Sequence, residues 1–124
     1  MSFRAILSEI VERCSGCMGV VLMGVDGISI EEVTSARVPD GPLSDEIGTA
    51  GVEFTRILDE IRKASDALAG GAVSETIVVL ANFSLAFRPV DEETFLIAVV
   101  APDGNLGKAR YLMRQHLLAI RQEL

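Results

Sequence analysis

Three apolar segments in the second half of the chain limit the folds it can adopt more than any other feature. They read SETIVVL, FSLAFRPV and TFLIAVVAP at residues 74–80, 83–90 and 94–102, and only AN and DEE separate them. Such short connections join antiparallel strands, because a parallel pair needs a crossover of about a dozen residues or more. The pattern therefore predicts a three-stranded antiparallel meander. Pro89 has no backbone N–H to donate, so we expect the middle strand to end there.

The first third of the chain predicts a helix followed by a hairpin. Residues 2–13 carry apolar side chains at the spacing of one helical face. The next segment, CMGVVLMGV, is apolar on both alternating sets of positions, as expected for a strand that is covered on both faces. Asp26-Gly27 then predicts a type I′ turn, in which both residues adopt positive φ. The strand after it, ISIEEV, ends in acidic residues and suits a sheet edge.

The middle of the chain predicts a loop and a long helix. Residues 34–44, TSARVPDGPLS, show no periodicity and predict an exposed loop. We expect Ser44 or Asp45 to cap a second helix, which runs to about Leu68 and stops at the glycine pair that follows. The apolar stripe of this helix is wider than packing against one sheet requires.

Charge and length exclude several classes of function. A chain of 124 residues suits one domain, over residues 1–124. Its 18 acidic residues outnumber 11 basic ones, and the net charge of −7 predicts no nucleic-acid partner and no anionic membrane surface. No apolar run approaches the ~20 residues that cross a bilayer. Glu9 and Glu12 interrupt the N-terminal apolar pattern where a secretory signal would be unbroken, so we expect a cytoplasmic protein.

The segment APDGNLGKA looks like the end of a phosphate-binding loop but does not meet its requirements. A GxxxxGK[ST] loop needs a glycine where this chain has Pro102 and a magnesium-binding hydroxyl where it has Ala109. The segment instead predicts the start of a last helix, with Gly104 in the preceding turn and Asp103 or Asn105 as the cap. We therefore expect no nucleotide cofactor here.

Cys14 and Cys17 have the spacing of a CxxC pair, which can serve thiol exchange or supply half of a zinc site. A structural zinc needs four ligands, and His116 is the only histidine, so we expect no metal. Redox pairs of this kind begin a helix, whereas this pair follows one, and both thiols fit the apolar pattern of a core. His116 is expected at the surface margin of the last helix's apolar stripe. No catalytic residue is predicted.

Two longer segments resemble the Roadblock family, which includes the dynein light chains of that name and the bacterial MglB gliding-motility regulators. ILSEIVERCSGCMGVVLMGVDGISI is similar to the family's opening helix, strand and hairpin. ETIVVLANFSLAFRPVDEETFLIAVVAPDGNLGKARYLMRQ is similar to its meander and to the Asn-Leu-Gly start of its last helix. The resemblance covers residues 6–124 and implies an α/β fold, more narrowly an α+β sandwich with a profilin-like five-stranded antiparallel sheet. The second helix would lie on one face of the sheet and the other two helices on the opposite face.

The resemblance also implies a homodimer, in which segment 74–80 pairs with its own copy and the two second helices lie together. The residue pattern agrees, because an apolar strand at a sheet edge invites pairing and the second helix carries surplus apolar surface. The expected interface residues are Thr76, Ile77, Val78, Val79 and Leu80 of the strand, and Phe54, Leu58 and Ile61 of the helix.

Members of the family bind small Ras-like GTPases, and the MglB-like ones stimulate GTP hydrolysis by reorganising the GTPase's own site. The resemblance therefore implies a non-enzymatic regulator, and the expected contacts on the second helix are Glu46, Glu53, Arg56 and Glu60. Three alternatives stay open. The protein could be a scaffold without effect on nucleotide turnover, a thiol-dependent enzyme that uses Cys14 and Cys17, or a sensor of a small ligand in a profilin-like cavity.

Overall fold

The computed structural model of the chain describes residues 2–35 and 42–124, with residues 42–50 described by their backbone alone. Three helices and five strands follow one another along it. In chain order they are α1 (Phe3–Arg13), β1 (Cys17–Gly24), β2 (Ser29–Thr34), α2 (Pro42–Ala67), β3 (Thr76–Val79), β4 (Ser84–Pro89), β5 (Thr94–Val100) and α3 (Leu106–Glu123). None of these helices combines the length and the apolar character that a bilayer-crossing segment requires.

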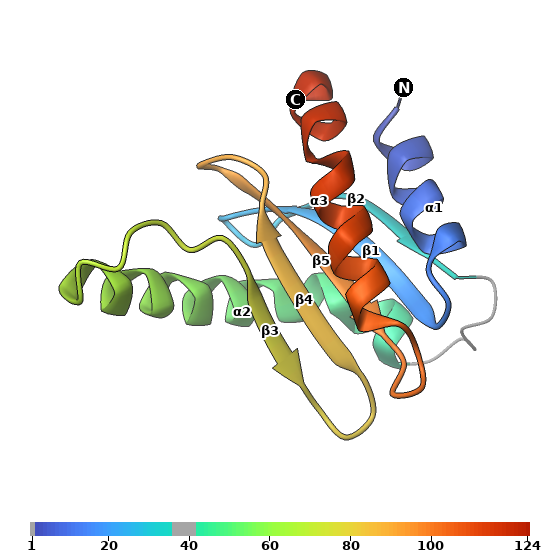
Figure 1. Ribbon diagram of the computed structural model, residues 1–124, viewed down its shortest axis with the longest axis horizontal. Helices are drawn as coiled ribbons and strands as arrows, with labels where there is room; N and C mark the ends of the chain where they lie inside the picture. The colour runs from blue at the N-terminus through green and yellow to red at the C-terminus, as the bar shows by residue number, and fades with distance from the viewer. Residues whose placement is uncertain (1, 36–41) are drawn as a thin grey trace.

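The five strands form one antiparallel sheet in the order β2-β1-β5-β4-β3 (Figure 1). The meander predicted from the short connections is confirmed, because β3, β4 and β5 are neighbours in sequence order. β4 ends at Pro89, as the missing N–H of proline requires. The acidic strand β2 lies at one edge of the sheet, also as predicted, and β3 lies at the other.

Helices cover both faces of the sheet, and two layers of apolar side chains result. α1 and α3 pack on one face, where alternate strand residues such as Val20 and Leu96 are fully buried. α2 packs on the opposite face against the intervening residues, among them Val21 and Ile97. The central strands β1 and β5 are therefore buried on both sides, which explains their unbroken apolar sequences. The predicted α+β sandwich is confirmed.

The hairpin between β1 and β2 differs from the predicted type I′ turn. Gly27 has φ of +87°, but Asp26 is not among the described residues with positive φ. The Gly27 N–H donates to the Gly24 carbonyl at 2.9 Å, and the Gly24 N–H donates to the Ile28 carbonyl at 2.9 Å. These bonds define a loop of three residues that ends in a left-handed glycine. Asp26 keeps negative φ and accepts a bond from the Ile28 N–H at 3.0 Å.

The long helix α2 starts earlier than predicted. It begins at Pro42, so Ser44 and Asp45 lie within it and do not cap it. Proline suits a first helical position, because its φ is already helical and the N–H it lacks would have no partner there. Of the loop predicted over residues 34–44, residues 36–41 lie outside the described residues.

The C-terminal end of α2 places a non-glycine residue in the left-handed region. Ala69 has φ of +54°. The Gly70 N–H donates to the Ser65 carbonyl at 2.9 Å and the Ala69 N–H donates to the Asp66 carbonyl at 3.1 Å, which is the bond pattern of a Schellman motif. The helix therefore ends at Ala67, and the left-handed residue that closes it is Ala69, one position before the glycine pair that was expected to stop it.

We expect Ala69→Gly to raise the free energy of unfolding by about 1 kcal/mol, because an alanine side chain is strained at positive φ and glycine is not. Urea denaturation measures the change. Ala72→Gly is the control, since Ala72 is exposed and has negative φ, and there the added freedom of the unfolded chain should lower stability slightly. Equal effects of the two substitutions would contradict the strain at Ala69.

Candidate interaction surfaces

The outer edge of β3 has no strand beside it in the described chain. The Leu80 N–H donates to the Phe83 carbonyl at 2.9 Å, which sets the phase of the ladder between β3 and β4. In an antiparallel ladder hydrogen-bonded pairs alternate, so Thr76 and Val78 bond to β4 while the backbone groups of Ile77 and Val79 point to the open edge. The Val79 side chain is 72% exposed. This edge is therefore available to another strand.

α2 crosses the sheet and its C-terminal turns project past the strands (Figure 1). The second half of α2 carries Ile57, which is 54% exposed, and the half-buried Ile61, and Leu68, which is 82% exposed, directly follows its last residue. These residues are spaced by four and seven positions, so they lie along one helical face. An apolar stripe of this kind without a partner marks a surface for association.

The residues predicted for the dimer interface fall into two groups. Phe54 and Leu58 pack largely on their own sheet, and the Phe54 ring lies 5.3 Å from that of Phe87. Val79 and Leu80 are exposed, whereas Thr76, Ile77, Val78 and Ile61 are half-buried. Ile57 and Leu68 were left out of the predicted interface although they are exposed. Their signal was the surplus width of the apolar stripe of α2.

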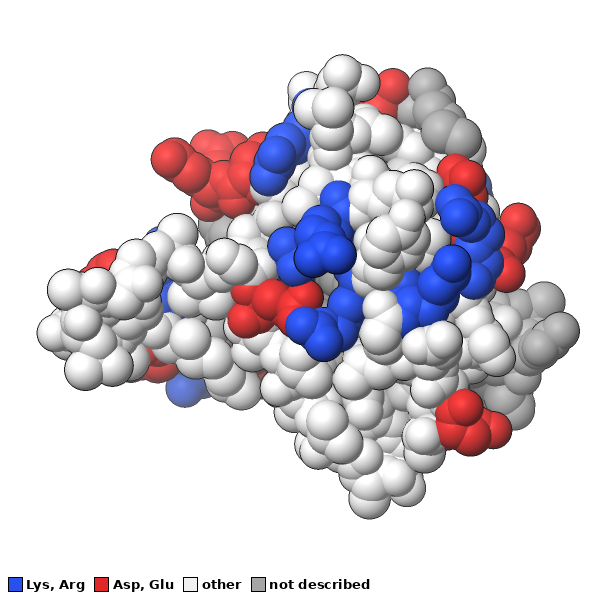
Figure 2. All heavy atoms as spheres, in the orientation of Figure 1, with Lys and Arg blue, Asp and Glu red and all other residues white. Residues whose placement is uncertain are grey.

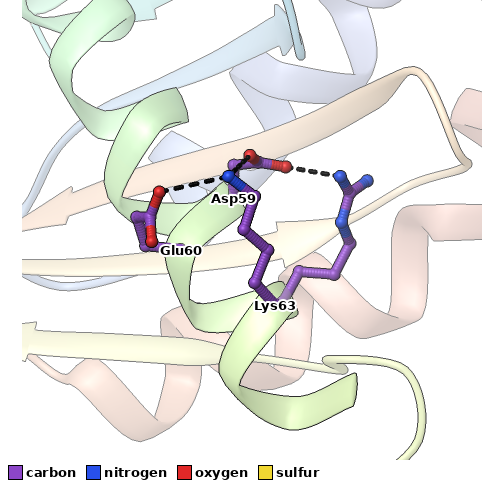
Figure 3. Close-up of polar contacts among 4 residues, drawn as sticks. Asp59, Glu60 and Lys63 are labelled. Atoms are coloured by element: carbon purple, nitrogen blue, oxygen red, sulfur yellow. Dashed lines mark hydrogen bonds and ion pairs between the residues drawn. The ribbon is translucent and has the colours of Figure 1, made fainter. Parts of the chain in front are cut away.

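Three of the four charged residues predicted to contact a partner lie on the exposed face of α2. Glu53, Arg56 and Glu60 are all exposed, and Glu46 lies where side chains are outside the described residues. Arg56 pairs with Glu53 at 3.2 Å, and Lys63 pairs with Glu60 at 3.3 Å and with Asp59 at 3.4 Å (Figure 3). Exposed pairs one helical turn apart contribute only ~0.3–0.5 kcal/mol each. Another protein could therefore exchange these partners at little cost.

The CSGC and APDGN segments, which the sequence singles out for chemistry, meet in space. The Ser15 carbonyl accepts from the Asn105 N–H and the Gly16 carbonyl accepts from the Ala101 N–H, each at 2.8 Å. The Asn105 side chain caps α3 by accepting from the Lys108 N–H at 2.9 Å, and Gly104 makes the preceding turn, both as predicted. The two turns thus join the end of α1 to the start of α3.

Both cysteines are buried and free. Burial raises the pKa of Cys14, and burial together with the neighbouring Cys14 raises the pKa of Cys17 to about 12. Thiol exchange requires the thiolate, so neither thiol is activated at neutral pH. No group of three or more His, Cys, Asp or Glu side chains that could hold a metal ion occurs in the described part of the chain.

His116 is buried, and its predicted position at the surface margin is wrong. Its Nδ1 donates to the Leu112 carbonyl at 2.8 Å, and its Nε2 lies 3.2 Å from Oε2 of Glu9 in α1. The reason is tertiary, because α1 packs beside α3 and covers the margin of its apolar stripe. His116 therefore connects two helices.

A half-buried carboxylate, that of Glu75, lies between β4 and α3. Glu75 accepts from Arg88 at 2.8 Å through one oxygen and from Nε of Arg110 at 2.7 Å through the other. Burial raises the pKa of Glu75, but the hydrogen bonds and positive charges of Arg110 and Arg88 outweigh this effect, so the pKa lies below its usual value. A hollow of about 190 Å³ beside this group is lined by Glu75, Arg88, Gly107, Arg110, Tyr111 and Arg114. Sequence reasoning missed this cluster, since residues far apart in the chain form it.

We expect Glu75→Gln to lower the free energy of unfolding by about 2 kcal/mol at pH 7, because two charge-assisted bonds lose their carboxylate. Because the pKa of Glu75 in the folded protein lies below its unfolded value of about 4.3, the ionised carboxylate stabilises the fold above that value. This contribution to stability is lost as the pH falls through the folded-state pKa. The difference between variant and wild type should therefore shrink below pH 4. Urea unfolding across pH measures it. Glu60→Gln, at an exposed position on α2, should show little difference at any pH.

The chain is an α+β sandwich in which the edge strand β3 has no neighbouring strand on its outer side among the described residues. The solved structure of MglC from Myxococcus xanthus is 33% identical to this chain, covers 100% of both chains and superposes with a TM-score of 0.70. The chain therefore belongs to the Roadblock family, to which its sequence was similar. A scan of protein-family models gave no match, and neither did a search of curated proteins.

Two more distant structures share the fold. A Roadblock/LC7 domain from Streptomyces avermitilis is 17% identical, with a TM-score of 0.82 over 98% of this chain and 97% of that one. The gliding protein MglB from Thermus thermophilus is 15% identical, with a TM-score of 0.85 over 97% of this chain and 86% of that one. At these identities the likeness establishes the fold alone.

Proposed function

We propose that this protein is a homodimeric regulator that docks on a small Ras-like GTPase and stimulates its GTP hydrolysis without supplying a catalytic residue. The observation that carries most weight is the open edge of β3 beside the projecting, apolar end of α2. The regulator and adaptor character of Roadblock proteins supports the same conclusion.

Pairing of two β3 strands explains both features at once. Antiparallel strands that pair edge to edge are related by a two-fold axis perpendicular to the sheet, so corresponding faces lie on the same side. The two sheets would become one, with both copies of α2 on one face. Ile57, Ile61 and Leu68 would then cover the partner's α2 and sheet, which buries apolar surface that a single copy exposes.

The outer faces of the paired α2 helices form the proposed docking surface for the GTPase. Glu53, Arg56 and Glu60 occur twice on this surface, once in each copy. Charges of both signs suit electrostatic recognition of a polar partner. Stimulation would come from ordering the GTPase's own residues, as the resemblance to the MglB-like members of the family implies.

The test is to mix the protein with each Ras-like GTPase encoded in the same genome, loaded with GTP, and to measure binding and the rate of phosphate release. We expect a complex and faster hydrolysis. Arg56→Glu should weaken binding about tenfold, while Arg4→Glu, an exposed charge reversal on α1, should leave it unchanged. If no GTPase forms a complex or hydrolyses faster, the proposal is wrong.

An adaptor role without stimulation is the second candidate. It is favoured by a cluster of cations on the face opposite α2, which leaves a second surface for another protein. Complex formation with an unchanged rate of hydrolysis would support this role over the first.

A further inference from the structure

The outward face of α3 presents a row of cationic and large apolar side chains. Arg110, Tyr111, Arg114 and Leu118 follow one another at helical spacing, and all four are exposed. We call these four residues the α3 stripe. They point away from the buried residues of α3, such as Leu112 and Ile120, so packing of the chain on itself does not account for them.

The charge around the α3 stripe is opposite to that of the whole chain. The protein has a net charge of −7. Near the stripe, however, Arg88, Arg110 and Arg114 line one hollow together with Glu75, which is the only carboxylate among the described residues that line it. Lys108 lies over the neighbouring Tyr111 ring. Figure 2 shows Lys and Arg gathered on the face that carries α3, with most of the acidic side chains toward its rim.

Several of these cations are free to bind. Among the described residues, Arg114 has no ion pair or hydrogen bond, and Lys108 has no carboxylate partner but lies 5.4 Å from the Tyr111 ring. Arg110 is half exposed while it holds Glu75. Arginine pairs with carboxylates through parallel hydrogen bonds, and the Glu75 site already uses this chemistry.

The surface is also hollowed and partly apolar. The hollow of about 190 Å³ lies beside Arg110, Tyr111 and Arg114. Tyr111 is 45% exposed and Leu118 is 65% exposed, so an incoming segment would find apolar surface between the cations. Tyr and Arg are the residue types that contribute most to binding at protein interfaces.

We propose that the α3 stripe docks an acidic segment of another protein, one that carries apolar residues between its carboxylates. From Arg110 to Leu118 the stripe is ~12 Å long, which matches about two turns of a helix. A nucleic acid or a membrane would extend beyond the stripe and meet the repulsion of a chain whose net charge is −7, whereas a short peptide need not extend beyond the stripe. The stripe lies on the opposite side of the sheet from α2, so the inference does not depend on the GTPase proposal.

The test uses the full chain and a fluorescein-labelled peptide of about 12 residues, made of Glu and Leu in helical repeat. Fluorescence anisotropy should show binding that weakens with added salt. Arg114→Glu should weaken binding about tenfold or more. The substitution should leave the fold intact, because Arg114 makes no ion pair or hydrogen bond with the described residues. The matched control is Arg62→Glu on α2, which makes the same change of charge and should alter the affinity less than about twofold. Glu75→Gln, which removes the competing carboxylate, should tighten binding.

Three results would overturn the inference. The first is equal binding of a peptide in which Gln replaces every Glu. The second is equal weakening by Arg114→Glu and Arg62→Glu, which would reflect the overall charge alone. The third is tighter, Arg114-dependent binding of a single-stranded RNA or of vesicles with anionic lipid, which would assign the stripe to a different class of partner. None of these outcomes depends on whether a GTPase binds α2.

Discussion

Replacing Val79 with proline should convert the proposed dimer into a monomer. The Val79 N–H points to the open edge of β3, so proline removes a bond to the partner strand and leaves the ladder to β4 intact. Two-fold symmetry repeats the loss in the other copy. At ~1 kcal/mol for each bond, and with the clash of both rings, the total is about 3 kcal/mol, which raises the dissociation constant roughly a hundredfold. Light scattering across a dilution series measures the mass.

Val79→Lys is a second variant with the same expected result, because a lysine at a strand edge opposes pairing. Ile28→Lys is its control: Ile28 is an exposed apolar residue at the hairpin next to the other edge of the sheet, and the substitution should leave the dimer intact. A wild-type protein that stays monomeric at micromolar concentration would contradict the dimer and the GTPase surface built on it. Loss of the dimer in both lysine variants would point to a different interface.

Replacing Gly16 with alanine should lower the free energy of unfolding by about 3 kcal/mol. A side chain at Gly16 would overlap the backbone of Gly104, and its φ of +79° is unfavourable for any other residue. Neither backbone can retreat easily, since the Ser15 and Gly16 carbonyls hold the turn before α3 at 2.8 Å. Urea or thermal denaturation measures the loss.

Gly107→Ala is the matched control for this prediction. Gly107 lies in the first turn of α3, and a methyl group there would meet only the Asn105 side chain, at 3.6 Å. Alanine favours a helix by ~1 kcal/mol over glycine, so this variant should be slightly more stable than wild type. If both glycine variants behaved alike, close contact between the two turns could not be the reason that Gly16 is a glycine.

Local rules account for the parts of the fold that could be predicted. Short connections require an antiparallel meander, proline ends β4, and Asn105 caps α3, and each depends on a few neighbouring residues. The type I′ turn failed because the Asp26 carboxylate bonds to the Ile28 N–H and Asp26 stays at negative φ. The cap at Ser44 or Asp45 failed because Pro42 is itself a good first residue.

The candidate surfaces show the same division between features that local rules predict and features that they miss. The strand 74–80 and the wide stripe of α2 were visible as surplus apolar residues, since surface left over after one contact can be judged along a single element. The sequence did not show which residues of that stripe pack on the chain's own sheet. In the structure Phe54 packs on the sheet, whereas Ile57 and Leu68 are exposed. The contacts of Arg88 and Arg110 with Glu75 join elements far apart in the chain.

For this protein, periodicity and turn chemistry in the amino-acid order were enough to predict the order of helices and strands, and the resemblance of two segments indicated the family. Only the packed structure decided that Ile57 and Leu68 stay exposed, that His116 is buried against Glu9, and that the two glycine turns touch. The physical reason is the distance along the chain over which each effect acts. Propensity and capping act over one or two helical turns, whereas exposure, close approach and charge clustering depend on which distant segments the sheet brings together.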